Sequence, residues 1–294
     1  MTDYWCFSAI LQGQTLPLET GLEVVLAAKA ISIEKTDNDY SRIEAWFEDK
    51  PDSDQLATVV SRSVQRENLI DQQILCYRGR DWLAENRKAF APILIGPFWI
   101  YGSHVMQAHP AGSLPLLVDA AQAFGSGTHP TTQTCLLALA ELRKMKNPPH
   151  RILDMGCGSA ILAMASQRLF PAANILAVDN DPVSVRSARA NRQKNQISPM
   201  KMWAIVSDGF ADRAVQRNGP YDLIMANILV GPLRRMASDF SHGLSPGGYL
   251  ILSGLLHHQA QQIVGDCRAR KLILEARQNR DEWCCLVFRK RQRG

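Results

Sequence analysis

Metal-ligand patterns, disulfide patterns and membrane-spanning runs are all missing from this sequence of 294 residues. Its seven cysteines are scattered and odd in number, with no C-x-x-C pair and no Cys/His cluster at zinc-ligand spacing, so we expect no disulfide framework and no structural metal. No apolar run approaches the roughly 18 residues of a membrane span, and residues 1–7 contain Asp3 instead of the basic residues of a secretion signal. We therefore expect a cytoplasmic protein in a reducing compartment, without membrane association.

Composition and charge describe a globular protein with two unlike parts. With 46% hydrophobic and 21% charged residues and no repeat or low-complexity tract, the chain is neither disordered nor fibrous, and at roughly 100 to 200 residues per domain its length predicts two domains. Residues 1–109 carry a net charge of −5 and residues 110–294 a net charge of +10. An acidic part attracts a basic partner and a basic part attracts phosphates or RNA, although two ordinary solvated surfaces explain the same numbers.

The first 101 residues alternate between strand-like and helix-like patterns. Apolar residues at helical spacing mark residues 18–30 and 54–67, and strand-like runs occupy residues 4–11, 42–47 and 73–77. This order predicts a small α+β, ferredoxin-like domain over residues 1–101, with a further helix at residues 81–90. Residues 102–115 are rich in Gly, Pro, His and Ser and are the predicted linker.

From residue 116 onward, short apolar strands alternate with turns and helices. A helical segment follows each of the strands predicted at residues 151–155, 174–179, 201–206 and 222–226. The last three strands are predicted at residues 247–252, 272–274 and 283–288. No long helix is predicted between the last two of them. This rhythm predicts a Rossmann-like α/β domain over residues 116–294, with a mostly parallel, doubly wound sheet and an antiparallel end. Ligands of such sheets bind at the carboxyl ends of the strands.

The turn after the first of these strands indicates a ligand class. Gly156 and Gly158 allow backbone amides to approach a ligand where a Cβ would collide. A dinucleotide fingerprint needs a third glycine where this chain has Ile161, so a nicotinamide or flavin site is disfavoured. An acidic residue followed by two glycines instead suits S-adenosylmethionine, which has no phosphates, although a plain strand-to-helix turn also contains such residues.

Three later strand ends carry polar side chains. Asp179 ends the second strand, where its carboxylate would accept hydrogen bonds from a ribose diol, and Asp181 before Pro182 is expected to cap the next helix. Asp208, after the third strand, is a candidate partner for an adenine amino group or a loop residue. Asn227 ends the fourth strand, where it either orients an amine or caps a helix.

A loop upstream of the first strand completes the candidate site. Residues 123–132 read AFGSGTHPTT, in which Phe124 is available for stacking and Thr132 for a hydrogen bond. His129 is either a base or, as helix-entry histidines more often are, a structural residue. Cys157 lies between the two glycines but has no partnered histidine in the sequence, so we expect no nucleophile there.

At these residues the chain resembles the ribosomal protein L11 methyltransferase family (PrmA). The resemblance rests on AFGSGTHPTT, on DMGCGS, on ANILVGPL, on LSG and on EWC. It implies a class I methyltransferase domain joined by a flexible linker to a smaller domain that recognises the substrate. It also implies that Thr132, Gly156, Asp179 and Asn227 contact S-adenosylmethionine. Where the family usually has glycine this chain has Ala160. We expect its methyl group to be tolerated if φ stays negative there, to crowd the cofactor and weaken its affinity, and not to abolish binding.

The predicted function follows from this resemblance and from the chemistry of the cofactor. We expect a protein methyltransferase that moves the sulfonium methyl directly to a neutral lysine Nε or α-amino group of a basic ribosomal protein, with Asn227 positioning the amine and no general base. One alternative is a nucleic-acid methyltransferase, whose asparagine would normally lie in an N-P-P-aromatic run that residues 227–229 lack. Another is a non-catalytic, ribosome-associated binding module. We expect a monomer. Basic residues 289–293 carry enough charge for incidental RNA contact, but at the end of the chain a frayed, solubilising tail is the interpretation that we favour.

Overall fold

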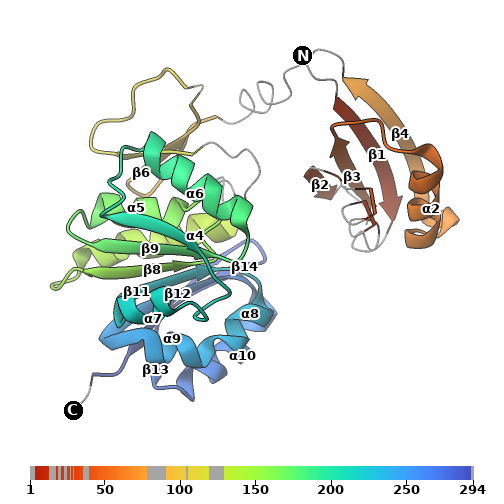
Figure 1. Cartoon of the computed structure of the whole chain (residues 1–294). Helices are drawn as coiled ribbons and strands as arrows, with labels where there is room; N and C mark the ends of the chain where they lie inside the picture. The colour runs from red at the N-terminus through yellow and green to blue at the C-terminus, as the bar shows by residue number, and fades with distance from the viewer. Residues whose placement is uncertain are drawn as a thin grey trace. The chain divides into compact units, whose positions relative to one another are not determined.

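The computed structural model describes residues 4–12, 18, 21–22, 25–26, 28, 30–35, 40–77, 91–103, 105–118 and 129–292. The chain forms two compact units, Met1–Ala89 and Phe90–Gly294, each with its own apolar core (Figure 1). None of the helices in the described ranges is long and apolar enough to cross a membrane.

The N-terminal unit is an antiparallel sheet packed against helix α2. Its strands lie in the order β2-β3-β1-β4, which is that of the predicted ferredoxin-like domain. The elements are β1 Tyr4–Gln12, β2 Ala30–Lys35, β3 Tyr40–Phe47, α2 Ser53–Ser63, the short 3-10 helix η1 Arg66–Asn68 and β4 Leu69–Tyr77. Helix α2 begins where the Asp52 carboxylate accepts two backbone N–H groups, and it buries Leu56, Val59 and Val60 at helical spacing. Six of the thirteen residues of the helix predicted at residues 18–30 lie outside the described residues.

The C-terminal unit is built on a seven-stranded sheet in the order β10-β9-β8-β11-β12-β14-β13. Neighbouring strands from β10 to β12 are parallel, and β14 is antiparallel to both β12 and β13. The strands are β8 Arg151–Met155, β9 Asn174–Asp179, β10 Met202–Val206, β11 Tyr221–Asn227, β12 Leu244–Leu256, β13 Leu272–Arg280 and β14 Trp283–Lys290. The predicted doubly wound sheet with an antiparallel end is confirmed.

Helices cover both faces of this sheet (Figure 1). One face carries α4 Pro130–Glu141, the 3-10 helix η2 Leu142–Lys144, α5 Ile161–Leu169 and α6 Pro182–Lys194. The other carries α7 Arg213–Asn218, α8 Val230–Arg235, α9 Ala237–Gly243 and α10 His257–Arg268. Successive strand residues such as Ile152 and Leu153 enter opposite cores. Because both faces are buried, the central strands are continuous apolar runs, the pattern that predicted a parallel sheet.

A three-stranded sheet in the same unit corrects the predicted domain boundary. Strands β5 Ile93–Ile95, β6 Phe98–Tyr101 and β7 Leu114–Leu117 lie side by side, with β6 and β7 parallel. Their buried side chains Phe98, Ile100 and Leu116 join the core formed with α4 and α5. Residues 102–113 therefore connect two strands of one sheet, so the segment predicted as a linker belongs to the C-terminal unit. The units divide between residues 89 and 90, and the helix predicted at residues 81–90 lies outside the described residues.

Candidate active site

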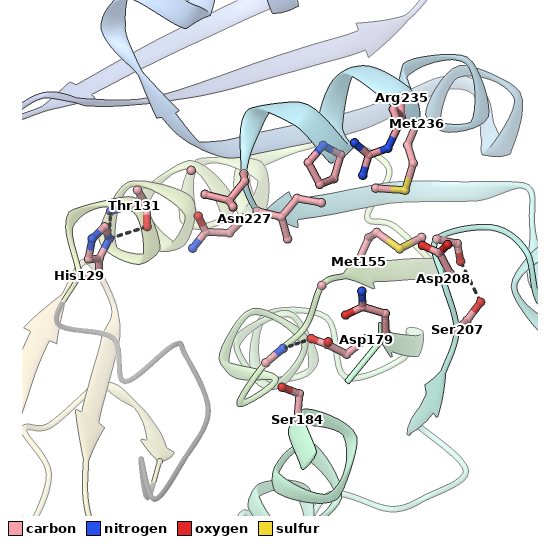
Figure 2. A pocket seen from close by; sticks show the side chains of 18 of the residues that line it. His129, Thr131, Met155, Asp179, Ser184, Ser207, Asp208, Asn227, Arg235 and Met236 are labelled. Atoms are coloured by element: carbon pink, nitrogen blue, oxygen red, sulfur yellow. Dashed lines mark hydrogen bonds between the residues drawn. The ribbon is translucent and has the colours of Figure 1, made fainter. Parts of the chain in front are cut away.

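A cavity of about 590 Å³ opens at the carboxyl ends of strands β8, β9, β10 and β11. Figure 2 shows side chains from these strand ends, from α8 and from the start of α4 gathered around it. Its lining includes Met155, Asp179, Asp208, Asn227 and Arg235. The cavity thus lies at the edge of the sheet where the sequence predicts a ligand.

The turn between β8 and α5 needs glycine at two cavity-lining positions. Gly156 and Gly158 have φ values of +71° and +50°, in the left-handed region that side chains disfavour. A Cβ on Gly156 would lie 2.2 Å from Cγ2 of Ile228, the residue after β11. The carbonyl of Val178 in β9 accepts the N–H groups of Gly156 and Cys157 at 2.7 and 2.9 Å. The glycines therefore let the backbone itself form part of the cavity wall.

Asp179 at the end of β9 is held from two sides. Its Oδ2 accepts the N–H of Gly158 at 2.9 Å, and its Oδ1 accepts the N–H of Asp181 at 3.0 Å. Asp181 is the N-cap of α6, where the N–H groups of Val183 and Ser184 hold the pKa of its carboxyl below the ordinary value. Asp181 is thus a capping residue, as predicted, whereas Asp179 has lone pairs left for a ligand in the cavity.

Asn227 at the end of β11 has a free acceptor. Its Nδ2 donates to Oγ1 of Thr132 at 3.3 Å, whereas its Oδ1 is the one buried side-chain oxygen in the described ranges without a hydrogen-bond partner. Asn227 lines the cavity, but Thr132 is buried behind it in α4 and does not. Because buried acceptors are nearly always paired, this oxygen marks a position for a donor group of a ligand. Thr132 therefore contacts the cavity-lining Asn227 and not the cavity itself.

His129 and Trp283 meet at the cavity wall. Their ring centroids are 5.1 Å apart with an interplanar angle of 67°, and Nδ1 of His129 lies 2.7 Å from Oγ1 of Thr131. Burial lowers the pKa of the imidazole, an effect that the Glu282 carboxylate opposes, so the ring is neutral at pH 7. His129 is also the N-cap of α4. Of the two roles considered for His129, a base or a structural residue, its contacts therefore support the structural one.

Comparison with known proteins identifies the family. The chain matches the family model described as Ribosomal protein L11 methyltransferase (PrmA) over residues 15–291. The chain belongs to this family. The ribosomal protein L11 methyltransferase of Bradyrhizobium diazoefficiens is 35% identical to it, over 90% of this chain and 88% of that protein. The one of a Caulobacter species is 33% identical, over 99% of this chain and 100% of that protein. A crystal structure of a ribosomal protein L11 methylase from Lactobacillus delbrueckii subsp. bulgaricus, 25% identical, superposes with a TM-score of 0.60 over 69% of this chain and 99% of that chain.

In this PrmA family member a second carboxyl group lies buried under the glycine turn. Oδ2 of Asp154 accepts the N–H of Ala163 at 2.9 Å. Burial raises the pKa of Asp154 to about 7, and the nearby Asp179 carboxylate also raises it. Burial and the same carboxylates raise the pKa of the Cys157 thiol well above its ordinary value. Cys157 therefore stays protonated, which agrees with the expectation that it is no nucleophile.

The departure from the usual PrmA pattern at Ala160 affects the backbone and not the cavity. Its φ is +62°, so the condition under which we expected alanine to be tolerated, a negative φ, is not met. The chain must turn sharply here to enter α5, with the Ala160 N–H bonded to the carbonyl of Cys157 at 2.7 Å. The methyl group of Ala160 is fully buried in the core and does not line the cavity. The alanine therefore does not crowd a ligand in the cavity. Its cost is a left-handed alanine, about 1–2 kcal/mol.

Some residues of the PrmA-family cavity were missed by the reasoning from individual residues. Met155, Arg235 and Met236 line it but belong to an apolar strand and a basic helix with no distinctive pattern. Gly254 had a usable signal, because a glycine inside a strand marks close backbone approach. Its φ is +79°, and a Cβ there would lie 2.3 Å from the carbonyl oxygen of Ile228. Residues 119–128, with the predicted stacking residue Phe124, lie outside the described residues.

Proposed function

We propose that this protein transfers the methyl group of S-adenosylmethionine to amino groups, lysine Nε or α-amino, of ribosomal protein L11. Membership of the family supports methyl transfer, and the names of its relatives support this substrate. The observation that carries the proposal is the unpartnered Oδ1 of Asn227 in the cavity. An acceptor at this position binds one N–H of an amine and thereby fixes the direction of its lone pair.

The cavity residues fit S-adenosylmethionine. Asp179 and Asp208 both line the cavity. We expect the Asp179 carboxylate to accept hydrogen bonds from a ribose diol and Asp208 to accept one from the adenine amino group. A volume of about 590 Å³ is typical of a site for a ligand of this size. When bound, the cofactor supplies a methyl group on a positively charged sulfur, which leaves without an acid. Gly156 and Gly158 would bring backbone close to it.

The protein's own task is to supply an uncharged and aligned amine. Much of the cavity lining is apolar, including Met155, Ile228, Leu229 and Pro232. Entry of a lysine into such surroundings disfavours the ammonium form and lowers its pKa from the ordinary value of about 10.4, so the proton is lost to water before or during docking. Asn227 is not basic, so its role is to align the amine for in-line attack.

Substrate recognition is proposed for the N-terminal unit. Residues 1–89 carry a net charge of −5, and residues 90–294 carry +10. A basic ribosomal protein is therefore attracted to the N-terminal unit and repelled by the rest of the chain, apart from the acidic groups of the cavity itself.

The test is transfer of labelled methyl groups to a mixture of purified ribosomal protein L11 and ribosomal RNA, analysed by gel and mass spectrometry. We expect label on amino groups of the protein. Asn227→Ala should lower kcat by about 100-fold because the amine loses its alignment, whereas the matched control Asn147→Ala, at an exposed position outside the cavity, should not. An unchanged kcat in Asn227→Ala would contradict the assignment. Label on RNA would favour a nucleic-acid methyltransferase, and neither label nor cofactor binding would favour a non-catalytic module.

A further inference from the structure

A second cavity, of about 190 Å³, lies at the opposite edge of the seven-stranded sheet. Its lining includes Arg151 and Asn174, the first residues of β8 and β9, together with Trp203 of β10 and Arg217 and Asn218 of α7. Strand β8 has 5 residues, so this cavity is separated from the candidate active site by the strand's length of about 13 Å. The proposed methyl transfer does not use this edge.

The two guanidinium groups at this cavity have no carboxylate partner in the described part of the chain. The guanidinium of Arg217 makes no hydrogen bond or ion pair there, and the guanidinium of Arg151 makes one long hydrogen bond, 3.4 Å, to the carbonyl of Gly219. The neighbouring Asp222 is already engaged, because its Oδ2 accepts the N–H groups of His150 and Arg151 and its Oδ1 accepts the Ser245 hydroxyl. The lining therefore carries two positive charges and no negative one.

Trp203 adds a planar surface beside these charges. The indole is partly exposed and also packs against the core on the α7 face of the sheet. An aromatic ring of this kind is a stacking surface for nucleobases, and a pair of guanidinium groups is suited to the oxygens of a phosphate. Asn174 and Asn218 add amide groups that can bond to the edge of a base.

From this combination we propose that the second cavity binds one nucleoside phosphate, with the base against Trp203 and the phosphate between Arg151 and Arg217. A nucleotide within single-stranded RNA and a free nucleotide present the same chemistry. The proposal is independent of the methyl-transfer reaction, because none of its residues lines the candidate active site.

The test measures binding of a fluorescein-labelled oligouridylate by anisotropy, with UMP as competitor and saturating S-adenosylhomocysteine present to fill the larger cavity. Arg151→Gln combined with Arg217→Gln should weaken binding at least tenfold and reduce its salt dependence. The control, Arg268→Gln combined with Arg280→Gln, removes the same charge from exposed positions outside the cavity and should weaken binding less than twofold. Trp203→Leu keeps an apolar contact and should still weaken binding about tenfold. Retained methyl transfer shows that each variant is folded.

The two probes also distinguish the source of the ligand. Oligouridylate binding that UMP does not displace assigns the cavity to an RNA strand, and saturable binding of UMP without the oligomer assigns it to a free nucleotide. Equal weakening by both double variants would show that only general charge matters and would overturn the proposal. If neither probe binds, the proposal is overturned as well.

Discussion

Replacing Gly156 by alanine perturbs the glycine turn in two separable ways. Its φ of +71° disfavours alanine by about 1–2 kcal/mol. The new Cβ would lie 2.2 Å from Cγ2 of Ile228, and relieving such an overlap in a packed interior costs about 1–3 kcal/mol. Alanine also restricts the unfolded chain, which offsets about 0.4–1 kcal/mol. We therefore expect Gly156→Ala to lower the free energy of unfolding of the C-terminal unit by about 1–5 kcal/mol and to weaken S-adenosylmethionine binding.

The substitution Ile228→Ala separates the overlap from the backbone strain. It removes Cγ2, so the double variant with Gly156→Ala should be more stable than additivity predicts by about 1–3 kcal/mol. Gly254→Ala is the matched control, because its φ is also left-handed, at +79°, but its Cβ would meet the carbonyl oxygen of Ile228 at 2.3 Å. That oxygen remains in Ile228→Ala, so Gly254→Ala should gain nothing from the second substitution.

Equilibrium unfolding in urea, followed by circular dichroism and tryptophan fluorescence, gives the free energy of unfolding for the three single variants and the two double variants. The geometry requires a favourable coupling for the pair Gly156 and Ile228 and a coupling near zero for the pair Gly254 and Ile228. Equal couplings for both pairs, or none for the first, would refute the argument from side-chain overlap.

Thr132→Val removes the hydroxyl that accepts from the Asn227 amide and should lower kcat about tenfold with little change in cofactor affinity. Thr132→Ser keeps the hydroxyl and should keep most of kcat. If steady-state kinetics give Thr132→Val the same kcat as the natural protein, the positioning role is contradicted. Ala160→Gly should leave the Kd for S-adenosylmethionine within about threefold of that of the natural protein, because Ala160 does not line the cavity. A tenfold increase in affinity, measured by calorimetric titration, would show that the methyl group crowds the cofactor. Burial raises the pKa of Asp154 to about 7, so between about pH 4 and pH 7 the folded protein holds a proton that the unfolded chain has released. The contribution of Asp154 to the free energy of unfolding should therefore fall by up to about 4 kcal/mol as pH rises through this window and stay constant above it. Urea unfolding at several pH values should show this slope as a difference between the natural protein and Asp154→Asn; parallel curves would contradict it.

The strand-end residues could be predicted because local sequence determines each of them. Gly156 follows a continuous apolar run, and Asp179 lies just before the cap of α6. Asn227 ends another apolar run. Once the strands are parallel, their carboxyl ends meet at one edge of the sheet, so three separate local patterns define one cavity without any knowledge of side-chain contacts.

Features that depend on contacts between distant segments could not be predicted in this way. Residues 102–115 have the composition of a linker, but pairing of the four-residue strands β6 and β7 places them within one unit. The hydrogen bond between Asn227 and Thr132 joins residues 95 positions apart. Thr132 lies behind Asn227 and does not line the cavity, a position that the sequence around it does not reveal. The φ of Ala160 is left-handed, at +62°, which the identity of the residue does not reveal because alanine disfavours this region.

The hydrogen bonds of the glycine turn give a physical reason for the proposed class of cofactor. Turns that bind phosphates leave the N–H groups at the start of the helix free for phosphate oxygens. Here the N–H of Gly158 donates to Asp179, and the N–H of Ala163 in the first turn of α5 donates to Asp154. A pyrophosphate at this turn would find these two donors already used and would approach the Asp179 carboxylate, which lines the cavity. A ligand without phosphates and with a positive sulfur is instead attracted to this carboxylate. The missing third glycine at Ile161 and the occupied N–H groups therefore favour the same ligand class on independent grounds.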